Sequence, residues 1–393
     1  MVSKNKKTFF SKFNHGFTIV ELLIVIVVIG VLASIVIVAY NGVIKKATIA
    51  TLTSDLSNAS SQLKVYKLSN RTYPTALDAD NCPIAPVVDN SLCLKSSSDN
   101  TFSYGSDGKT FALNEINSRT NDIVYNVTEK TVPAPGKACF VGFVTVPDDS
   151  TYGASNICIM KYEAKNDGSG KVISSAAGYP WTSIDYNNAN TAAKTACVGC
   201  HLVTEAEWMT LAKNLLSVNS NWSGGSVGSG FVYNGHNDNG PSSYVAASTD
   251  DNDGYYKTNN VAPSDQRRTL TLSNGDVIWD IAGNVREWMN DQISTQKPGV
   301  LGGGGAYREW PTVTTTGVMP VSPFPISTGI SGAADWTNAT NGIGTLYSNT
   351  DVVSLYVPVR GGSWNDANAG VLSLYLGRTP TNVGVDLGFR VAQ

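Results

Sequence analysis

The chain has 393 residues, enough for two or three domains of ordinary size. Its formal net charge is −3, and only 15% of its residues are charged. After residue 67 the basic residues are scattered, apart from the isolated pair Arg267-Arg268. Nucleic-acid binding therefore has no support from the charge pattern, and we expect no nucleic-acid partner.

The N-terminal segment combines a basic flank with a long apolar run. Residues 17–40 are apolar except for Glu21 and a few small or polar residues, and at ~1.5 Å per helical residue they are long enough to cross a ~30 Å hydrocarbon layer. No small-residue cleavage site follows, so we predict a transmembrane helix that stays in the mature chain. A glutamate at membrane depth costs about 2.5–3.5 kcal/mol, so Glu21 needs a partner. The basic flank contains Lys4, Lys6, Lys7 and Lys12.

The string GFTIVE at residues 16–21 resembles the processing site of type IV prepilins and of type II secretion pseudopilins. The resemblance implies that a prepilin peptidase removes the leader, residues 1–16, by cutting between Gly16 and Phe17 and then methylates the new N-terminus. It also implies that Glu21 neutralises the Phe17 amine of a neighbouring subunit in the filament core. A single-pass protein of the cytoplasmic membrane would then become a cell-surface pilus subunit.

The residues after the apolar run predict a small globular domain, which we call the head. One helical stripe of apolar residues continues to about Asn70, and Pro74 discourages further helix. Residues 101–116 predict two strands around a Ser-Asp-Gly turn. Residues 17–128 thus resemble a pilin module of the pseudopilin type, in which we expect Cys82 to pair with Cys93. The stripe consists of Leu52, Leu56, Ala59, Leu63 and Tyr66.

A linker with two prolines and a glycine separates this module from a second region that is rich in Gly, Asn, Ser and Thr. Four more cysteines follow, and an exported domain favours disulfides, with three possible connectivities. The pattern Cys197-x-x-Cys200-His201 also admits zinc or thiol redox chemistry, but two further ligands at a suitable spacing are missing. The four cysteines are Cys139, Cys158, Cys197 and Cys200.

Four blocks of the second region resemble the signatures of the formylglycine-generating-enzyme domain, a variant of the C-type-lectin fold. They are CIMKYEAKN, TEAEW, WDIAGNVREW and RGGSW with the final GFR; they occur in order from residue 158 to residue 390, and the resemblance covers residues 139–393. The fold class we predict is therefore α+β: a long N-terminal pilin helix with a small β head, then a loop-rich lectin-like domain. Without the resemblance, TEAEW predicts only a helix start, in which Thr204 and Glu207 form a capping box.

The enzymes of that family oxidise a substrate cysteine with a cysteine pair located just after the GGSW motif. In this chain the equivalent segment is NDANAG, residues 365–370, and no cysteine follows Cys200. The reactive thiolate has no substitute among the other side chains. We therefore predict that the protein is not an enzyme.

Non-catalytic branches of the fold bind ligands with the residues after GGSW and between the last two arginines. Amide and carboxylate side chains beside aromatic rings suit the recognition of a surface glycan or protein, although Asn, Asp and Gly also serve as turn formers. We expect the motif arginines Arg360 and Arg390 to be structural. The predicted ligand-binding residues are Trp364, Asn365, Asp366, Asn368, Tyr375, Arg378, Thr381 and Asn382.

The resemblance also implies a calcium site. Asp280 and Glu287 would supply carboxylates, and Gly283 and Val285 would supply carbonyl oxygens, which suits a hard cation that takes 6–8 oxygen ligands. Arg286 departs from the family pattern, because an aromatic residue is usual there. Its guanidinium could point away from the site or compete for Glu287.

Taken together, the sequence predicts a minor type IV pilin that displays a lectin-like adhesin domain. The first alternative is a type II secretion-type pseudopilin whose C-terminal domain contacts cargo, and the second is a formylglycine-generating-type enzyme.

Overall fold

The computed structural model describes residues 19–119, 124–155, 157–197, 199–255, 266–293, 306–308, 342–348, 355–367 and 369–393. The predicted processing residues Gly16 and Phe17 lie outside these residues, as do Asn368 and the side chain of Glu21. The chain divides into two compact units, residues 1–51 and residues 52–393.

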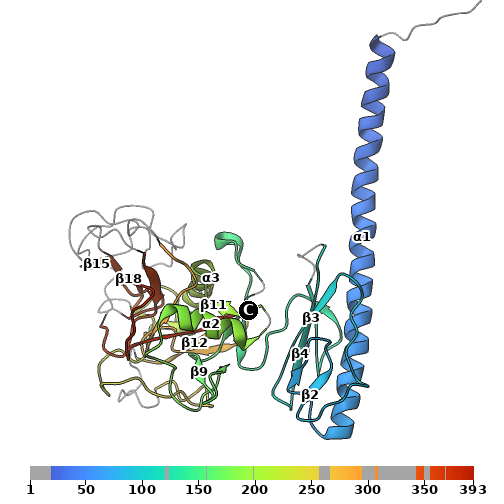
Figure 1. The fold of residues 1–393 in the computed structure, drawn as a ribbon. Coiled ribbons are helices and arrows are strands. Elements are labelled where there is room, and N and C mark those ends of the chain that lie inside the picture. Colours follow the sequence, from blue (N-terminus) through green and yellow to red (C-terminus); the bar gives the residue numbers. More distant parts are fainter. Residues whose placement is uncertain are drawn as a thin grey trace, which may run out of the picture. The chain divides into compact units, whose positions relative to one another are not determined.

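Helix α1 (Ile19–Asn70) is one continuous helix, shown in blue in Figure 1. Its end at Asn70 confirms the prediction. Between Ile19 and Ile44 most of its large apolar side chains are exposed. We predicted a transmembrane helix over residues 17–40; among the residues with described placement, no helix has the length and apolar character that crossing a membrane requires, so this prediction is not confirmed.

The head packs on the last turns of α1. The predicted stripe is buried there, from Leu52 to Tyr66 at 0–1% exposure. It contacts apolar residues of strands β3 (Asn100–Ser106) and β4 (Phe111–Asn117), which form the predicted hairpin (Figure 1). The sheet continues through β5 (Val124–Thr128) to β6 (Ala134–Pro135), past the predicted boundary at residue 128, because β6 pairs with β5.

The head also contains the short pair β1 (Ala76–Leu77) and β2 (Pro83–Ala85). The loop beyond β2 is tied to the start of that strand by the disulfide Cys82–Cys93, which confirms the predicted pairing.

The C-terminal domain is built on two larger sheets with helices α2 (Tyr186–Ala196) and α3 (Glu205–Leu216). The four-stranded sheet has the order β11-β20-β8-β7, and its strand β20 is antiparallel to both neighbours. Its strands are β7 (Phe143–Val146), β8 (Ile157–Met160), β11 (His201–Leu202) and β20 (Val391–Ala392).

The six-stranded sheet has the order β15-β16-β18-β17-β14-β19. Strand β14 pairs antiparallel with β17 and parallel with β19, so three signature blocks of the sequence become neighbours. The strands are β14 (Arg286–Trp288), β15 (Ala306–Arg308), β16 (Leu346–Ser348), β17 (Val357–Arg360), β18 (Leu374–Arg378) and β19 (Leu387–Phe389).

Helix α3 starts with the predicted capping box: Thr204 Oγ1 accepts from the Glu207 amide, and the Glu207 carboxylate accepts from the Thr204 amide. Its apolar face, with Trp208, Leu211 and Leu215, is fully buried in the main core. The remaining short elements are η1 (Ser150–Tyr152), η2 (Asn219–Asn221), β9 (Lys165–Asn166), β10 (Val172–Ile173), β12 (Thr269–Thr271) and β13 (Val277–Trp279).

Candidate functional site

The signature arginines and acids pair with one another inside the C-terminal domain. The Arg360 guanidinium, at the end of β17, binds the carboxylate of Glu205 in the first turn of α3, with Nε 3.0 Å from Oε2. Both side chains are at most 1% exposed. Burial raises the pKa of Glu205, and the charge of Arg360 opposes that rise. The pair joins two segments that are 155 residues apart in the sequence.

A second pair has the same design. Arg390 donates to both oxygens of Glu287 on β14, at 2.9 and 3.1 Å, and also to the carbonyl oxygens of Met160 and Trp279. Neither Arg390 nor Glu287 is exposed. The guanidinium thus joins three strands, β8, β13 (Val277–Trp279) and β14, a structural role of the kind expected of the motif arginines.

The residues predicted to bind calcium do not fit a calcium site. Both oxygens of Asp280 accept from Arg268, at 2.6 and 2.7 Å, and Glu287 is held by Arg390. A cation placed between these carboxylates would meet two guanidinium groups instead of free lone pairs. Among the described residues, no cluster of three or more His, Cys, Asp or Glu side chains is suited to a metal.

Gly283 and Val285, which were expected to offer carbonyl oxygens, have a packing role that the structure does show. Gly283 has a φ of +75°, and a Cβ there would lie 2.5 Å from the His236 carbonyl oxygen. The amide of Val285 donates to buried Glu163, at 3.1 Å. Burial, followed by the charges of Asp280 and Glu287, raises the pKa of Glu163 well above its usual value.

Arg286, the first residue of β14 in the six-stranded sheet, forms a different arrangement. Its guanidinium turns away from Glu287 and pairs with Asp366, at 2.9 Å, and with Asp386. These two carboxylates come from the segment after GGSW and from the loop before β19. The departure from the family pattern at Arg286 therefore creates an ion-pair cluster on the predicted ligand-binding side of the domain.

Tyr375 lies over this cluster. Its ring stacks on Tyr347 with centroids 4.2 Å apart and planes 7° from parallel. The guanidinium carbons of Arg286 and Arg378 lie 5.5 and 5.6 Å from the Tyr375 ring centroid, within the range of cation–π interaction. We call the six residues Arg286, Tyr347, Asp366, Tyr375, Arg378 and Asp386 the Tyr375 cluster.

Several polar atoms around the Tyr375 cluster are buried without a partner. Thr345 is 4% exposed and its Oγ1 makes no hydrogen bond, and it lines a cavity of about 10 Å³ together with Arg286, Asp366 and Tyr375. Arg378 Nε and Trp364 Nε1 are also unpartnered. A buried polar atom without a hydrogen bond is costly, so each of these atoms has capacity for a ligand or a water.

The predicted ligand residues divide into two groups. Asp366, Tyr375 and Arg378 meet in the Tyr375 cluster. Asn382 instead caps its own turn, where its Oδ1 accepts from the Thr379 amide at 2.8 Å, and exposed Thr381 lies in the same turn. Exposed Asn365 accepts from Ser363 Oγ at 2.9 Å, and half-buried Trp364 is held by backbone bonds to Asn239 and Asn284.

Sequence reasoning missed Asp386 and Tyr347. Asp386 lies in the final signature block, but its charge had no visible partner in the sequence. Tyr347 is far from any signature and meets Tyr375 only because β16 pairs with β18 in register. Arg286 could have indicated Asp386, because a buried arginine in place of an aromatic residue needs acidic partners nearby.

The cysteines leave no thiol for chemistry. Besides the head disulfide, Cys139 bonds to Cys158 and Cys197 bonds to Cys200, which accounts for all six cysteines of the chain. The pairing resolves the three connectivities left open by the sequence. It also uses the Cys197-x-x-Cys200 pattern in a short disulfide.

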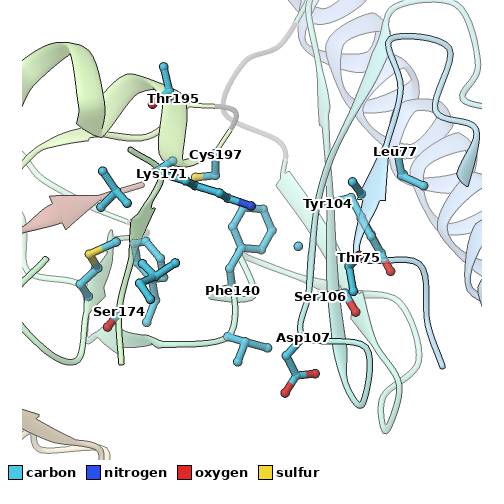
Figure 2. A pocket seen from close by; sticks show the side chains of 18 of the residues that line it. Thr75, Leu77, Tyr104, Ser106, Asp107, Phe140, Lys171, Ser174, Thr195 and Cys197 are labelled. Carbon is cyan, nitrogen blue, oxygen red and sulfur yellow. The ribbon is translucent and has the colours of Figure 1, made fainter. Parts of the chain in front are cut away.

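Figure 2 shows a cavity of about 600 Å³ within the unit formed by residues 52–393. Tyr104 and Asp107 line it from the β3–β4 hairpin, and Phe140, Lys171 and Cys197 line it from the chain that follows the linker. None of the predicted ligand-binding residues borders this cavity, so it is separate from the Tyr375 cluster.

The paired signatures, the two-sheet core and the chain order together define the class of protein. Residues 125–393, more than half of the chain, match the sulfatase-modifying factor enzyme 1-like domain, and the chain belongs to this family. Residues 11–37 match the prokaryotic N-terminal methylation motif.

The N-terminal part is similar to particular secretion proteins. Over 61 residues it is 47% identical to the type II secretion system core protein G of Dickeya chrysanthemi, which covers 16% of this chain and 40% of that protein. The corresponding protein of Escherichia coli K12 is 45% identical over 61 residues, again 16% of this chain and 42% of that protein. The chain therefore spans about two fifths of the length of these relatives, and it carries a pilin or pseudopilin N-terminus ahead of its family domain.

Proposed function

We propose that the protein is a minor subunit of a type IV pilus that displays a non-catalytic ligand-binding domain. The observation that carries the proposal is the Tyr375 cluster: aromatic rings, opposed charges and unpartnered polar atoms gather on a domain in which every cysteine is in a disulfide. Such a set of groups is suited to binding a ligand. It offers no thiolate, which the oxidation of a substrate cysteine would require.

The N-terminal motif supports the proposed processing and assembly into a filament. Cleavage after Gly16 would expose Phe17 for methylation by a prepilin peptidase, and Glu21 would meet the Phe17 amine of an adjacent subunit. The exposed apolar side chains between Ile19 and Ile44 form a surface that needs covering, and other pilin subunits would cover it in the filament. Before assembly, this segment would keep the chain at the cytoplasmic membrane; afterwards the domain would be displayed at the cell surface.

A binding experiment tests the surface. The purified mature chain is screened against a glycan array and against intact cells, in parallel with Tyr375→Ala. We expect the variant to lose at least about tenfold in affinity, because truncating a central aromatic contact commonly costs 2 kcal/mol or more. Tyr179→Ala is the matched control, because Tyr179 is a 60% exposed tyrosine of the same domain outside the cluster. Equal binding by Tyr375→Ala and wild type would contradict the proposal.

Localisation tests the role in the pilus. An antibody against residues 139–393 should label pilus tips or scattered points, because a large appendage would crowd a regular lattice. Uniform labelling along every pilus would argue against a minor subunit.

The second candidate is a pseudopilin whose C-terminal domain contacts secreted cargo. Its support is the similarity of the N-terminal segment to the type II secretion system core proteins G. A deletion strain distinguishes the candidates: loss of secretion with adhesion intact favours the pseudopilin, and the opposite result favours the pilus adhesin.

A further inference from the structure

Another cleft of the domain lies along helix α2 and is also lined by Val383 of the loop before β19. Its volume is about 530 Å³, which is within the range of small-ligand sites. Trp181 and Val383 contribute apolar walls, and Asp185, Asn188, Thr191 and Thr195 contribute a polar rim from successive turns of α2 and its N-cap. None of the residues that line this cleft belongs to the Tyr375 cluster.

The aromatic wall of the cleft is held in place from behind. Half-buried Trp181 packs against buried Phe389, with ring centroids 5.8 Å apart, and its backbone amide donates to the Ala164 carbonyl at 2.8 Å. Val383 is 58% exposed although it is apolar. A fixed indole and an exposed aliphatic side chain give a ligand contact area at little cost in conformational entropy.

The polar rim consists mainly of hydrogen-bond acceptors. Thr191 Oγ1 donates to the Asn187 carbonyl at 2.9 Å, and Thr195 Oγ1 donates to the Ala192 carbonyl at 2.8 Å. Each hydroxyl has thus used its one hydrogen and keeps acceptor lone pairs for a ligand. The Asp185 carboxylate adds two acceptor oxygens, which take bonds from Asn188 at 2.8 and 2.9 Å and retain further lone pairs.

The acceptors of the rim favour a ligand that is rich in hydrogen-bond donors and carries no negative charge. No Lys, Arg or His is among the residues that line the cleft, so nothing there would neutralise an anion. A single carboxylate is too little for a bare metal cation, which takes several oxygen ligands. A sugar meets both requirements. Its hydroxyl groups can donate to the acceptors of the rim, and the C–H bonds on one face of its ring can pack on the indole of Trp181.

We propose that the α2 cleft binds a neutral saccharide, with the indole of Trp181 as its platform and with Asp185, Thr191 and Thr195 as acceptors for sugar hydroxyls. This cleft shares no residue with the Tyr375 cluster, so an experiment can contradict one of the two proposed binding sites and leave the other standing.

The test uses the purified mature chain and a panel of neutral trisaccharides: maltotriose, cellotriose, chitotriose and mannotriose. Binding is measured by calorimetry and by saturation-transfer NMR. We expect at least one trisaccharide to bind, and we expect Trp181→Ala to weaken that binding at least about tenfold. Because Trp181 also packs on Phe389, the double variant Thr191→Val/Thr195→Val provides a second test that preserves shape; it should weaken binding about threefold or more.

Two controls separate the sites. Lys194→Gln changes an exposed residue on the same helix that does not line the cleft, and it should leave trisaccharide binding unchanged. Tyr375→Ala should also leave it unchanged, whatever its effect on the ligand of the Tyr375 cluster. The proposal is overturned if no neutral trisaccharide binds, if the cleft variants bind as wild type does, or if Tyr375→Ala abolishes the binding.

Discussion

The C-terminal domain uses the same arginine–carboxylate chemistry in two regions with different outcomes. In the interior, Arg360 with Glu205 and Arg390 with Glu287 are closed off from solvent, and their guanidinium groups also bind backbone carbonyls. In the Tyr375 cluster, Arg286 is shared between two aspartates, of which Asp386 is 17% exposed. The charges of the interior pairs are fully paired with each other, whereas buried polar atoms without a hydrogen-bond partner lie beside the Tyr375 cluster.

The difference shows what the signature residues do. The family signatures that identify the chain are largely the interior pairs, which join distant segments. The residue that departs from the signature, Arg286, builds the Tyr375 cluster. The residues that identify the family are thus mainly interior ion pairs. The candidate binding site forms around Arg286, where this chain differs from the family pattern.

Breaking an interior pair should have the largest effect. In Glu205→Leu the buried Arg360 loses its carboxylate, and we expect a loss of about 3–5 kcal/mol in unfolding free energy. Chemical denaturation of the mature chain measures it. The double variant Glu205→Leu/Arg360→Met should recover much of this loss, because no unpaired charge remains. A cost below about 1 kcal/mol for the single variant would contradict an interior role.

A buried carboxyl without an arginine sharpens the comparison. Glu115 on β4 is fully buried, and burial, followed by the charge of Asp55, raises its pKa to about 9. Because the unfolded state releases this proton near pH 4.5 and the folded state holds it to about pH 9, stability should fall as pH rises through that window.

We expect wild type to lose on the order of 4 kcal/mol between pH 5 and pH 8 through Glu115, since one bound proton changes stability by about 1.4 kcal/mol per pH unit. Glu115→Gln should flatten the dependence, as measured by denaturant midpoints across pH. The exposed carboxylate Asp80 offers a control, and Asp80→Asn should keep the wild-type slope. An unchanged slope in Glu115→Gln would show that the carboxyl does not titrate as described.

Disrupting the Tyr375 cluster should cost somewhat less stability. Arg286→Leu removes the cation from buried Asp366 and from Asp386, but Asp386 is 17% exposed and can recover water, so we expect about 2–3 kcal/mol. Ligand binding by the Tyr375 cluster should fall at the same time. A loss as large as that of Glu205→Leu would make the two regions equivalent and remove the distinction between them.

The smallest effect should come from calcium. Since Arg268 and Arg390 occupy Asp280 and Glu287, millimolar calcium or a chelator should move the melting temperature by less than about 1 °C. A clear stabilisation by calcium, absent with magnesium, would show that the site rearranges to accept the ion.

Local features of the fold could be predicted from the sequence. The stripe from Leu52 to Tyr66, the end of α1, the β3–β4 hairpin and the Thr204–Glu207 capping box all depend on residues that lie close together in the chain. Propensity, periodicity and turn chemistry act at that range.

The Tyr375 cluster could be predicted only in part. Arg286 meets Asp366 and Asp386 across 80 and 100 residues, and Tyr347 meets Tyr375 through strand pairing. Calcium was expected because two carboxylates stood at a suitable spacing, yet Arg268, 12 residues away, occupies Asp280, and Arg390, 103 residues away, occupies Glu287. Spacing shows which groups are available, but only the tertiary structure shows which partner each one takes.

Strand β20 sets the order in which the domain can fold. It lies between β11 and β8, and Gln393 exchanges backbone hydrogen bonds with Cys158, at 2.8 and 3.1 Å. The four-stranded sheet is therefore incomplete until residues 391–393 are in place. The β7–β8 hairpin can form before that, but β11 pairs in this sheet only with β20, so completion of the sheet depends on contacts of high sequence separation, which form slowly.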